Sequence, residues 1–144
     1  MTRRDQDGKT TRRRGLALGI GAGFLAFASL TAFASPASAA DRYTMHTDDG
    51  DPGGVVSFWP NGDRVEVSDI EQDGWAVRLK VWDATTGKYK YGGTVGGFGN
   101  WKGWRASLGG KYNLAEKHLI KFEVCLVKSG RPSYCDTSKW RNNN

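Results

Sequence analysis

Few residues of this 144-residue chain are suited to catalysis by a nucleophile or a metal ion. Its two histidines, His46 and His118, do not stand beside a serine or cysteine in any nucleophile motif. Its two cysteines, Cys125 and Cys135, are better explained as a disulfide. A carboxylate pair for glycoside hydrolysis is defined by its spatial separation, which a sequence does not contain. We therefore expect no catalytic residue, no metal, no cofactor and no enzyme activity.

One acidic run resembles the start of a calcium-binding loop. Residues Asp69–Gly74 alternate acidic side chains and end in glycine, as an EF-hand loop begins. The twelfth position of such a loop is Lys80 here, where a bidentate glutamate is required. A weak oxygen site at Asp69–Asp73, helped by the acids of residues 48–51, stays open. We favour an acidic turn in which Gly74 supplies a positive φ.

Tryptophans are the side chains best suited to holding a ligand, and the chain has six of them. Exposed rings stack on sugars and are enriched at protein interfaces. Four of them fall on polar strand faces or in a glycine-rich segment and are our candidate ligand-stacking residues: Trp59, Trp82, Trp101 and Trp104. Plainer explanations stay open, because Trp59 could lie over Arg64 as a cation–π pair and the other rings could plug an open end of the fold.

Basic residues alternate with aromatic rings between residues 88 and 111. The basic ones are Lys88, Lys90, Lys102, Arg105 and Lys111. Such a segment suits a polyanion, for example a wall polymer or a nucleic acid. Lysines on an edge strand also prevent unwanted strand pairing, and we favour that interpretation.

The elements that position these residues are expected to be β-strands, because the apolar pattern has period two and not the helical period of 3.6. Residues 55–67 contain Asn61-Gly62, which favours a hairpin with a type I′ turn. This hairpin pairs Phe58 with Val65 on one face and Trp59 with Arg64 on the other. Residues 75–82 alternate in the same way and predict a half-buried strand.

The last hairpin should carry the disulfide. Residues 120–126 place their apolar side chains on one face and Cys125 on the other. A turn at residues 128–132 reverses the chain, and Cys125 and Cys135 lie symmetrically about Gly130. In an exported protein, two cysteines at hairpin spacing predict one disulfide across the strands.

Residues 1–40 predict a secretory signal peptide. Basic residues precede an uncharged apolar run at residues 15–33, and residues 35–40 are small, as a signal peptidase requires. No basic cluster follows Ala40, which argues against a membrane anchor. Residues 11–16 partly resemble a twin-arginine signal, so the export route stays open.

The strong positive charge belongs mostly to this segment. It holds six of the 21 basic and two of the 15 acidic residues, so the net charge falls from +6 to +2 without it. We therefore do not take the charge as a sign of nucleic-acid binding. The rest is predicted to be a flexible acidic segment, 41–52, and one immunoglobulin-like or fibronectin-like all-β sandwich of about seven strands, 53–144.

Several of these features together resemble a known group of proteins. They are the run Asp69–Gly74 before an alternating strand, Leu114 leading to Val124-Cys125, and Cys135 near Trp140. In this respect the chain resembles small secreted actinobacterial proteins that have no assigned activity. The spacing of Leu114, Ile120, Val124 and Leu126 is similar to the penultimate strand of fibronectin type III-like sandwiches, with Ile120 at the usual tyrosine position. The resemblance implies a secreted β-sandwich.

We expect a secreted, extracellular monomer that acts as a non-enzymatic binding or structural module. The expected partner is an extracellular glycan or cell-wall polymer held by the exposed tryptophans. A protein-binding module, such as an inhibitor of a secreted hydrolase, is the alternative, and a small extracellular hydrolase is the third possibility. Neither nucleic acid nor, after signal cleavage, a membrane is an expected partner.

The mature protein is expected to begin at Ala40 or Asp41, because cleavage follows the small-residue segment. N-terminal sequencing and the intact mass of the exported protein test this expectation. An uncleaved chain retained in the membrane would contradict it.

Overall fold

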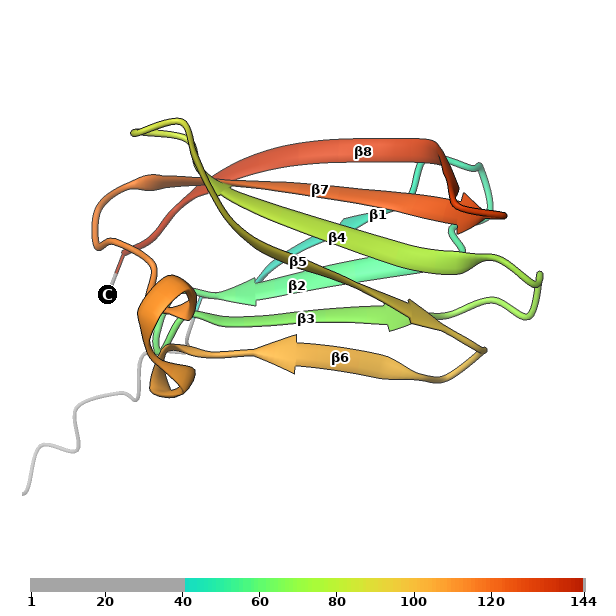
Figure 1. Ribbon diagram of the computed structural model, residues 1–144, viewed down its shortest axis with the longest axis horizontal. Coiled ribbons are helices and arrows are strands. Elements are labelled where there is room, and N and C mark those ends of the chain that lie inside the picture. The colour runs from blue at the N-terminus through green and yellow to red at the C-terminus, as the bar shows by residue number, and fades with distance from the viewer. Residues whose placement is uncertain (1–40, 144) are drawn as a thin grey trace, which may run out of the picture. The chain divides into compact units, whose positions relative to one another are not determined.

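Period-two alternation makes one side of each central strand apolar, and these sides face each other between two sheets. The computed structural model describes residues 41–143, so the predicted signal peptide lies outside the described residues (Figure 1). The elements are β1 (Tyr43–His46), β2 (Gly54–Trp59), β3 (Arg64–Asp69), β4 (Ala76–Asp83), β5 (Lys88–Gly96), β6 (Trp101–Trp104), β7 (Leu119–Lys128), β8 (Arg131–Arg141) and the 3-10 helices η1 (Ala106–Leu108) and η2 (Gly110–Tyr112).

The strands form two antiparallel four-stranded sheets, which confirms the predicted β-sandwich. The first sheet has the order β1-β2-β3-β6 and the second the order β5-β4-β7-β8. Without β1, this is the A-B-E and C′-C-F-G arrangement of a fibronectin type III-like sandwich. Residues 43–46, expected in a flexible segment, instead form the edge strand β1 paired with β2, so there are eight strands rather than about seven.

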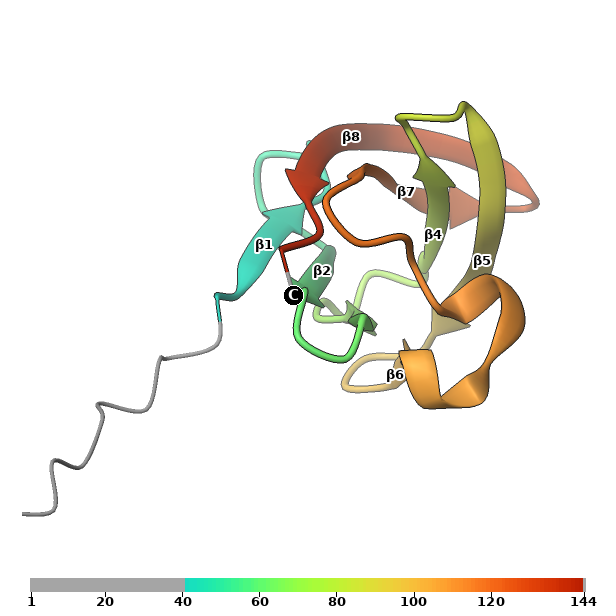
Figure 2. The ribbon, with the colours of Figure 1, turned by 90° about the vertical axis from the view of Figure 1, so that its left-hand side faces the viewer.

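The core lies between the sheets and consists of the inward residues of the alternating strands. Phe58 of β2 packs against Phe122 of β7, with ring centroids 5.0 Å apart. The fully buried apolar side chains include Val56, Phe58, Val65, Val67, Val77, Leu79, Val81, Ile120, Phe122 and Val124. At the side where β1 lies beside β8, the rings of Tyr43 and Trp140 stack with centroids 5.4 Å apart (Figure 2).

The β2–β3 hairpin has the predicted register but a different turn. Phe58 faces Val65 and Trp59 faces Arg64, as expected. Positive φ occurs at Gly62 (82°) and Asp63 (51°) and not at Asn61, so the turn is not type I′. Tertiary contacts explain the difference, because the buried Asp63 carboxylate accepts hydrogen bonds from Leu114 N and Asn142 Nδ2, each 2.8 Å long. Burial raises the pKa of Asp63 more than these hydrogen bonds lower it.

The β7–β8 hairpin has a two-residue turn in which both central residues have a positive φ. Ser129 (50°) and Gly130 (78°) connect the paired residues Lys128 and Arg131. This register alone would place Tyr134 opposite Cys125. A bulge between Val124 and Leu126 shifts the ladder by one residue, and Tyr134 takes a φ of 50° within it. The bulge brings Cys135 to Cys125, and the predicted disulfide is present.

The strand connections gather at two ends of the sandwich (Figure 1). Residues 47–53, 70–75, 97–100 and 129–130 lie at one end, which we call the acidic end. Residues 60–63, 84–87 and 105–118 lie at the other. In residues 41–143 no helix is long and apolar enough to span a membrane.

Replacing both Cys125 and Cys135 with alanine should lower the free energy of unfolding by about 2–3 kcal/mol, because the disulfide closes a short loop of the unfolded chain. Urea unfolding measures the loss, and far-UV circular dichroism should still report a β-protein. Reduction of the wild type is the matched control and should reproduce the loss. Free thiols titrated in the unreduced protein would contradict the pairing.

Candidate functional site

The outward side of the first sheet carries the best candidate site. Since Val65 and Val67 of β3 face the core, their neighbours along the strand face outward, and the same holds on β2 and β6. The outward cross-strand rows are Trp59–Arg64, Ser57–Glu66–Gly103 and Ser68–Trp101. An aromatic ring, a guanidinium and a carboxylate thus share one face.

A depression of about 460 Å³ lies over the β3–β6 part of this face. Its lining residues are Arg64, Glu66, Trp101, Gly103, Trp104, Arg105 and Leu108. Trp101 has 65 % of its surface exposed, and Leu108 has 54 %. A Cβ on Gly103 would lie 3.2 Å from Cζ3 of Trp101, so the indole lies against the glycine. The missing side chain at Gly103 therefore makes room for the indole of Trp101.

The polar groups of the depression are arranged around Arg64. Its Nε donates a hydrogen bond of 2.9 Å to Oε1 of Glu66, and Nη2 donates to the same oxygen. Within residues 41–143, no other side chain forms a hydrogen bond or ion pair with Arg105, which lies exposed in the lining. The depression therefore offers one neutralised guanidinium, one carboxylate and one free guanidinium.

Trp59 lies on the same face, but two guanidiniums already lie over its ring. The guanidiniums of Arg64 and Arg42 stand 4.5 and 5.1 Å from the ring centroid. Arg42 also donates to Oγ of Ser57, with Nη2 at 2.9 Å. The cation–π arrangement of Trp59 with Arg64 is thus present, and Trp59 is half-buried.

Trp104 is a core residue, so its expected exposure is wrong. It pairs with Val65 across the β3–β6 ladder and therefore faces inward, where 6 % of its surface is exposed. Its ring centroid lies 5.5 Å from that of Tyr91. A Cβ on Gly93 would approach Cζ2 of Trp104 to 2.7 Å, so this glycine makes room for the ring.

Trp82 lies on the outward side of the second sheet, so the four tryptophans do not share one surface. Its centroid is 5.7 Å from that of Tyr89, and the Lys121 ammonium lies 4.7 Å from its ring centroid. Only Trp101 among the four candidates combines high exposure with a neighbouring depression.

The acidic run belongs to a cluster of carboxylates at the acidic end. Gly74 has a φ of 74°, and Oδ1 of Asp73 accepts a hydrogen bond of 2.7 Å from Trp75 N, which confirms the turn. Burial and the charges of nearby aspartates, Asp51 and Asp73 first among them, raise the pKa of Glu71. In residues 41–143 no three His, Cys, Asp or Glu side chains are grouped so as to hold a metal ion.

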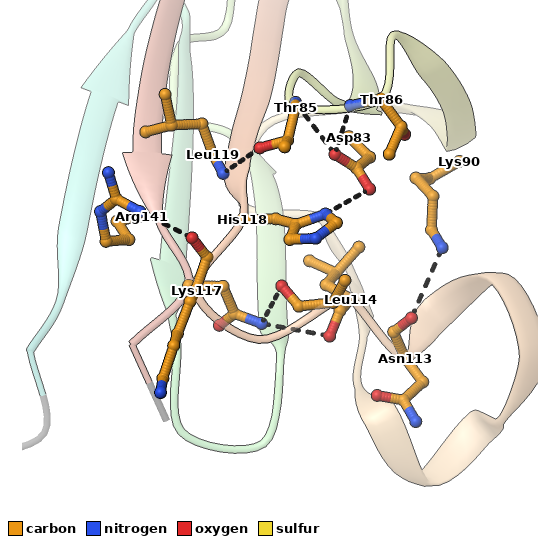
Figure 3. A network of polar contacts seen from close by, with 12 residues as sticks. Asp83, Thr85, Thr86, Lys90, Asn113, Leu114, Lys117, His118, Leu119 and Arg141 are labelled. Atoms are coloured by element: carbon orange, nitrogen blue, oxygen red, sulfur yellow. Dashed lines mark hydrogen bonds and ion pairs between the residues drawn. The ribbon is translucent and has the colours of Figure 1, made fainter.

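His118 joins two connections at the opposite end (Figure 3). Its Nδ1 lies 2.8 Å from Oδ2 of Asp83, whose Oδ1 accepts hydrogen bonds from the backbone of Thr85 and Thr86. Burial disfavours the charged Asp83, but the hydrogen bonds from His118 and Thr86 outweigh it and lower the pKa of Asp83. The Thr85 hydroxyl also accepts a hydrogen bond from Leu119 N. The histidine thus connects the β4–β5 turn to the start of β7.

A second, shallower depression of about 400 Å³ lies at the acidic end beside Phe98. Phe98 has 63 % of its surface exposed and stands between two glycines, Gly97 and Gly99, with φ of 94° and 81°. This turn is held by hydrogen bonds from Asn100 N to Gly97 O and from Gly99 N to Asp69 O, each 2.9 Å long.

The sequence interpretation did not identify Glu66, Gly103 or Leu108 as part of a site. The pairing of β3 with β6, which joins segments far apart in the sequence, brings Glu66 to Gly103 and Trp101. No protein-family model, curated protein sequence or solved structure gave a significant match to this chain.

Replacing Glu71 with glutamine should raise the melting temperature slightly at pH 7. Because the pKa of Glu71 is raised in the folded state, its ionisation costs stability as the pH rises through that pKa. The difference from the wild type should therefore shrink near pH 4, where Glu71 is protonated to a large extent.

Thermal unfolding at both pH values tests this prediction, with Asp41→Asn as a control that removes one charge outside the cluster. An unchanged or lower melting temperature for Glu71→Gln at pH 7 would contradict it. So would a rise of several degrees in the wild type on adding millimolar calcium, since the carboxylates would then hold a cation.

Proposed function

We propose that this chain is a secreted, non-enzymatic module that binds a glycan in the depression on the first sheet. The observation that carries the proposal is the position of Trp101, an indole with 65 % of its surface exposed at the side of a hollow of about 460 Å³. Two guanidiniums, from Arg64 and Arg105, and the Glu66 carboxylate line the same hollow.

This combination matches the chemistry of a sugar ring. The C–H groups on one face of a sugar pack against an indole, and the hydroxyl groups around its rim both donate and accept hydrogen bonds. Guanidiniums supply donors and a carboxylate supplies an acceptor. Because Arg64 and Glu66 already hold each other in position, they would lose little side-chain freedom on binding.

Other features support an extracellular role. The disulfide between Cys125 and Cys135 is typical of proteins that fold in an oxidising compartment. Residues 1–40 have the composition of an export signal, and the resemblance to small secreted actinobacterial proteins agrees with it. Both cysteines are joined in the disulfide, so neither is available as a thiol nucleophile, which favours binding over cysteine catalysis.

The second candidate function is binding of a protein partner at the acidic end. Phe98 favours it, because an exposed apolar ring at the tip of a hydrogen-bonded turn is pre-organised for a protein pocket. In that case Phe98→Ala would remove binding and Trp101→Ala would not.

Replacing Trp101 with alanine should weaken retention on an insoluble glycan, such as purified cell-wall peptidoglycan or cellulose, by about fivefold, since a stacked ring contributes about 1 kcal/mol. The free energy of unfolding should change by less than about 0.5 kcal/mol, because the ring lies on the surface. Pull-down isotherms measure the first quantity and urea unfolding the second.

Trp82→Ala is the matched control on cellulose, an uncharged glycan, since it removes an indole from the other sheet and should leave retention on cellulose unchanged. Equal retention of wild type and Trp101→Ala on every glycan that the wild type binds would refute the proposal, as would a wild type that binds none.

A further inference from the structure

The outward side of the second sheet carries a row of four side chains, one from each strand. Tyr89, Trp82, Lys121 and Lys139 are cross-strand neighbours on β5, β4, β7 and β8. Adjacent strands lie about 4.8 Å apart, so the row is about 14 Å long. The next outward row along the strands is Gly92–Lys80–Glu123–Thr137, and the row after that is Thr94–Arg78–Cys125–Cys135.

These three rows are strongly basic, and most of their charge has no counter-charge. Their single acid, Glu123, forms its ion pair with Arg78, at 3.8 Å. In the part of the chain that the structure describes, no carboxylate oxygen lies within ion-pair distance of Lys80, Lys121 or Lys139. Lys121 and Lys139 are also directly opposite each other, and like charges in this position destabilise a sheet. Within residues 41–143, neither lysine of this pair has an ion-pair partner.

An exposed ring lies at the end of the same row. Tyr89 has 57 % of its surface exposed and meets Trp82 edge to face, with an angle of 70° between the ring planes. A Cβ on Gly92 would lie 2.8 Å from the Tyr89 hydroxyl oxygen, so the side chain of Tyr89 extends over this glycine. The Lys121 ammonium, 4.7 Å from the Trp82 ring centroid, lies one strand away.

We propose that this outward side of β5, β4, β7 and β8 binds a linear acidic polysaccharide. A sugar ring would stack on Tyr89, and carboxylates along the polymer would lie against Lys121, Lys139 and Lys80. A bound polyanion would supply the missing counter-charge for the facing lysines. A single exposed ring beside separate ammonium groups suits a sugar polymer better than a nucleic-acid strand, which needs several rings in line with the backbone charges.

This surface is separate from the depression beside Trp101, because the two lie on the outward sides of different sheets. The proposal therefore does not depend on glycan binding by the first sheet.

The test measures binding of the mature, disulfide-bonded protein to polygalacturonate at low salt. The double variant Lys121→Gln/Lys139→Gln should bind about tenfold more weakly, since each exposed ion pair contributes about threefold to fivefold. The double variant Lys102→Gln/Lys111→Gln is the control. It removes the same charge as the test variant. Its lysines lie over the rings of Trp104 and Tyr112, as Lys121 lies over the ring of Trp82. The control should keep at least half of the wild-type affinity.

A second comparison isolates the contribution of the ring. Tyr89→Ala should weaken binding to polygalacturonate and leave binding to poly-glutamate unchanged. Melting curves confirm that each variant is folded.

Three results would overturn the proposal. One is equal loss in the two lysine double variants, which would indicate net charge alone. Another is an affinity for poly-glutamate or single-stranded DNA that equals or exceeds that for polygalacturonate. The third is a wild type that does not bind polygalacturonate.

Discussion

The pairing of β3 with β6 is the interaction on which the candidate glycan site depends. It places Val65 opposite Trp104 and Glu66 opposite Gly103. Burial of a large apolar side chain contributes about 1.5–3 kcal/mol, and a shift of one residue would turn Trp104 out to solvent and Trp101 into the core. The stability of the core therefore selects the register that exposes Trp101. The same short strand fills the core on one side and forms the depression on the other.

The two outward sheet faces differ in the way their charges are held. On the first sheet, Arg64 is neutralised by Glu66 and stacks on Trp59, so that charge is held in place by its neighbours. On the second sheet, Lys121 and Lys139 face each other, and the nearby Glu123 forms its ion pair with Arg78 instead. Four aspartates gather instead at the acidic end, around Glu71. Acidic and basic side chains are thus concentrated on different parts of the sandwich, although residues 41–144 have a net charge of only +2.

The sequence predicted what depends on neighbouring residues. The β2–β3 register and the alternation of β4 and β7 follow from local pattern, and the disulfide follows from cysteine spacing in a hairpin. The position of Trp104 could not be predicted, because it depends on pairing with Val65 of β3. The strands β4 and β5 separate these two residues in the sequence, although β3 and β6 are neighbours in the sheet. The four-strand row that includes Tyr89 and Lys139 could not be predicted for the same reason.

Turn geometry shows how tertiary contacts override local preference. Asn61-Gly62 favours a type I′ turn, yet positive φ occurs at Gly62 and Asp63, and the Asp63 carboxylate is bound by Leu114 and Asn142. Ser129-Gly130 has no such long-range contacts among its hydrogen bonds, and both of its residues adopt positive φ. The intrinsic preference of a dipeptide decides the turn only where no buried partner competes with it.

The bulge at Tyr134 also affects how this protein meets other copies of itself. β8 is the edge strand of the second sheet, and an unpaired edge is a template on which another chain can add a strand. The disulfide holds a kink in this edge, and the Tyr134 carbonyl already accepts a hydrogen bond from Asp48 N in the β1–β2 connection. The crosslink therefore protects solubility as well as stability, since it prevents the edge from becoming straight enough for intermolecular strand addition.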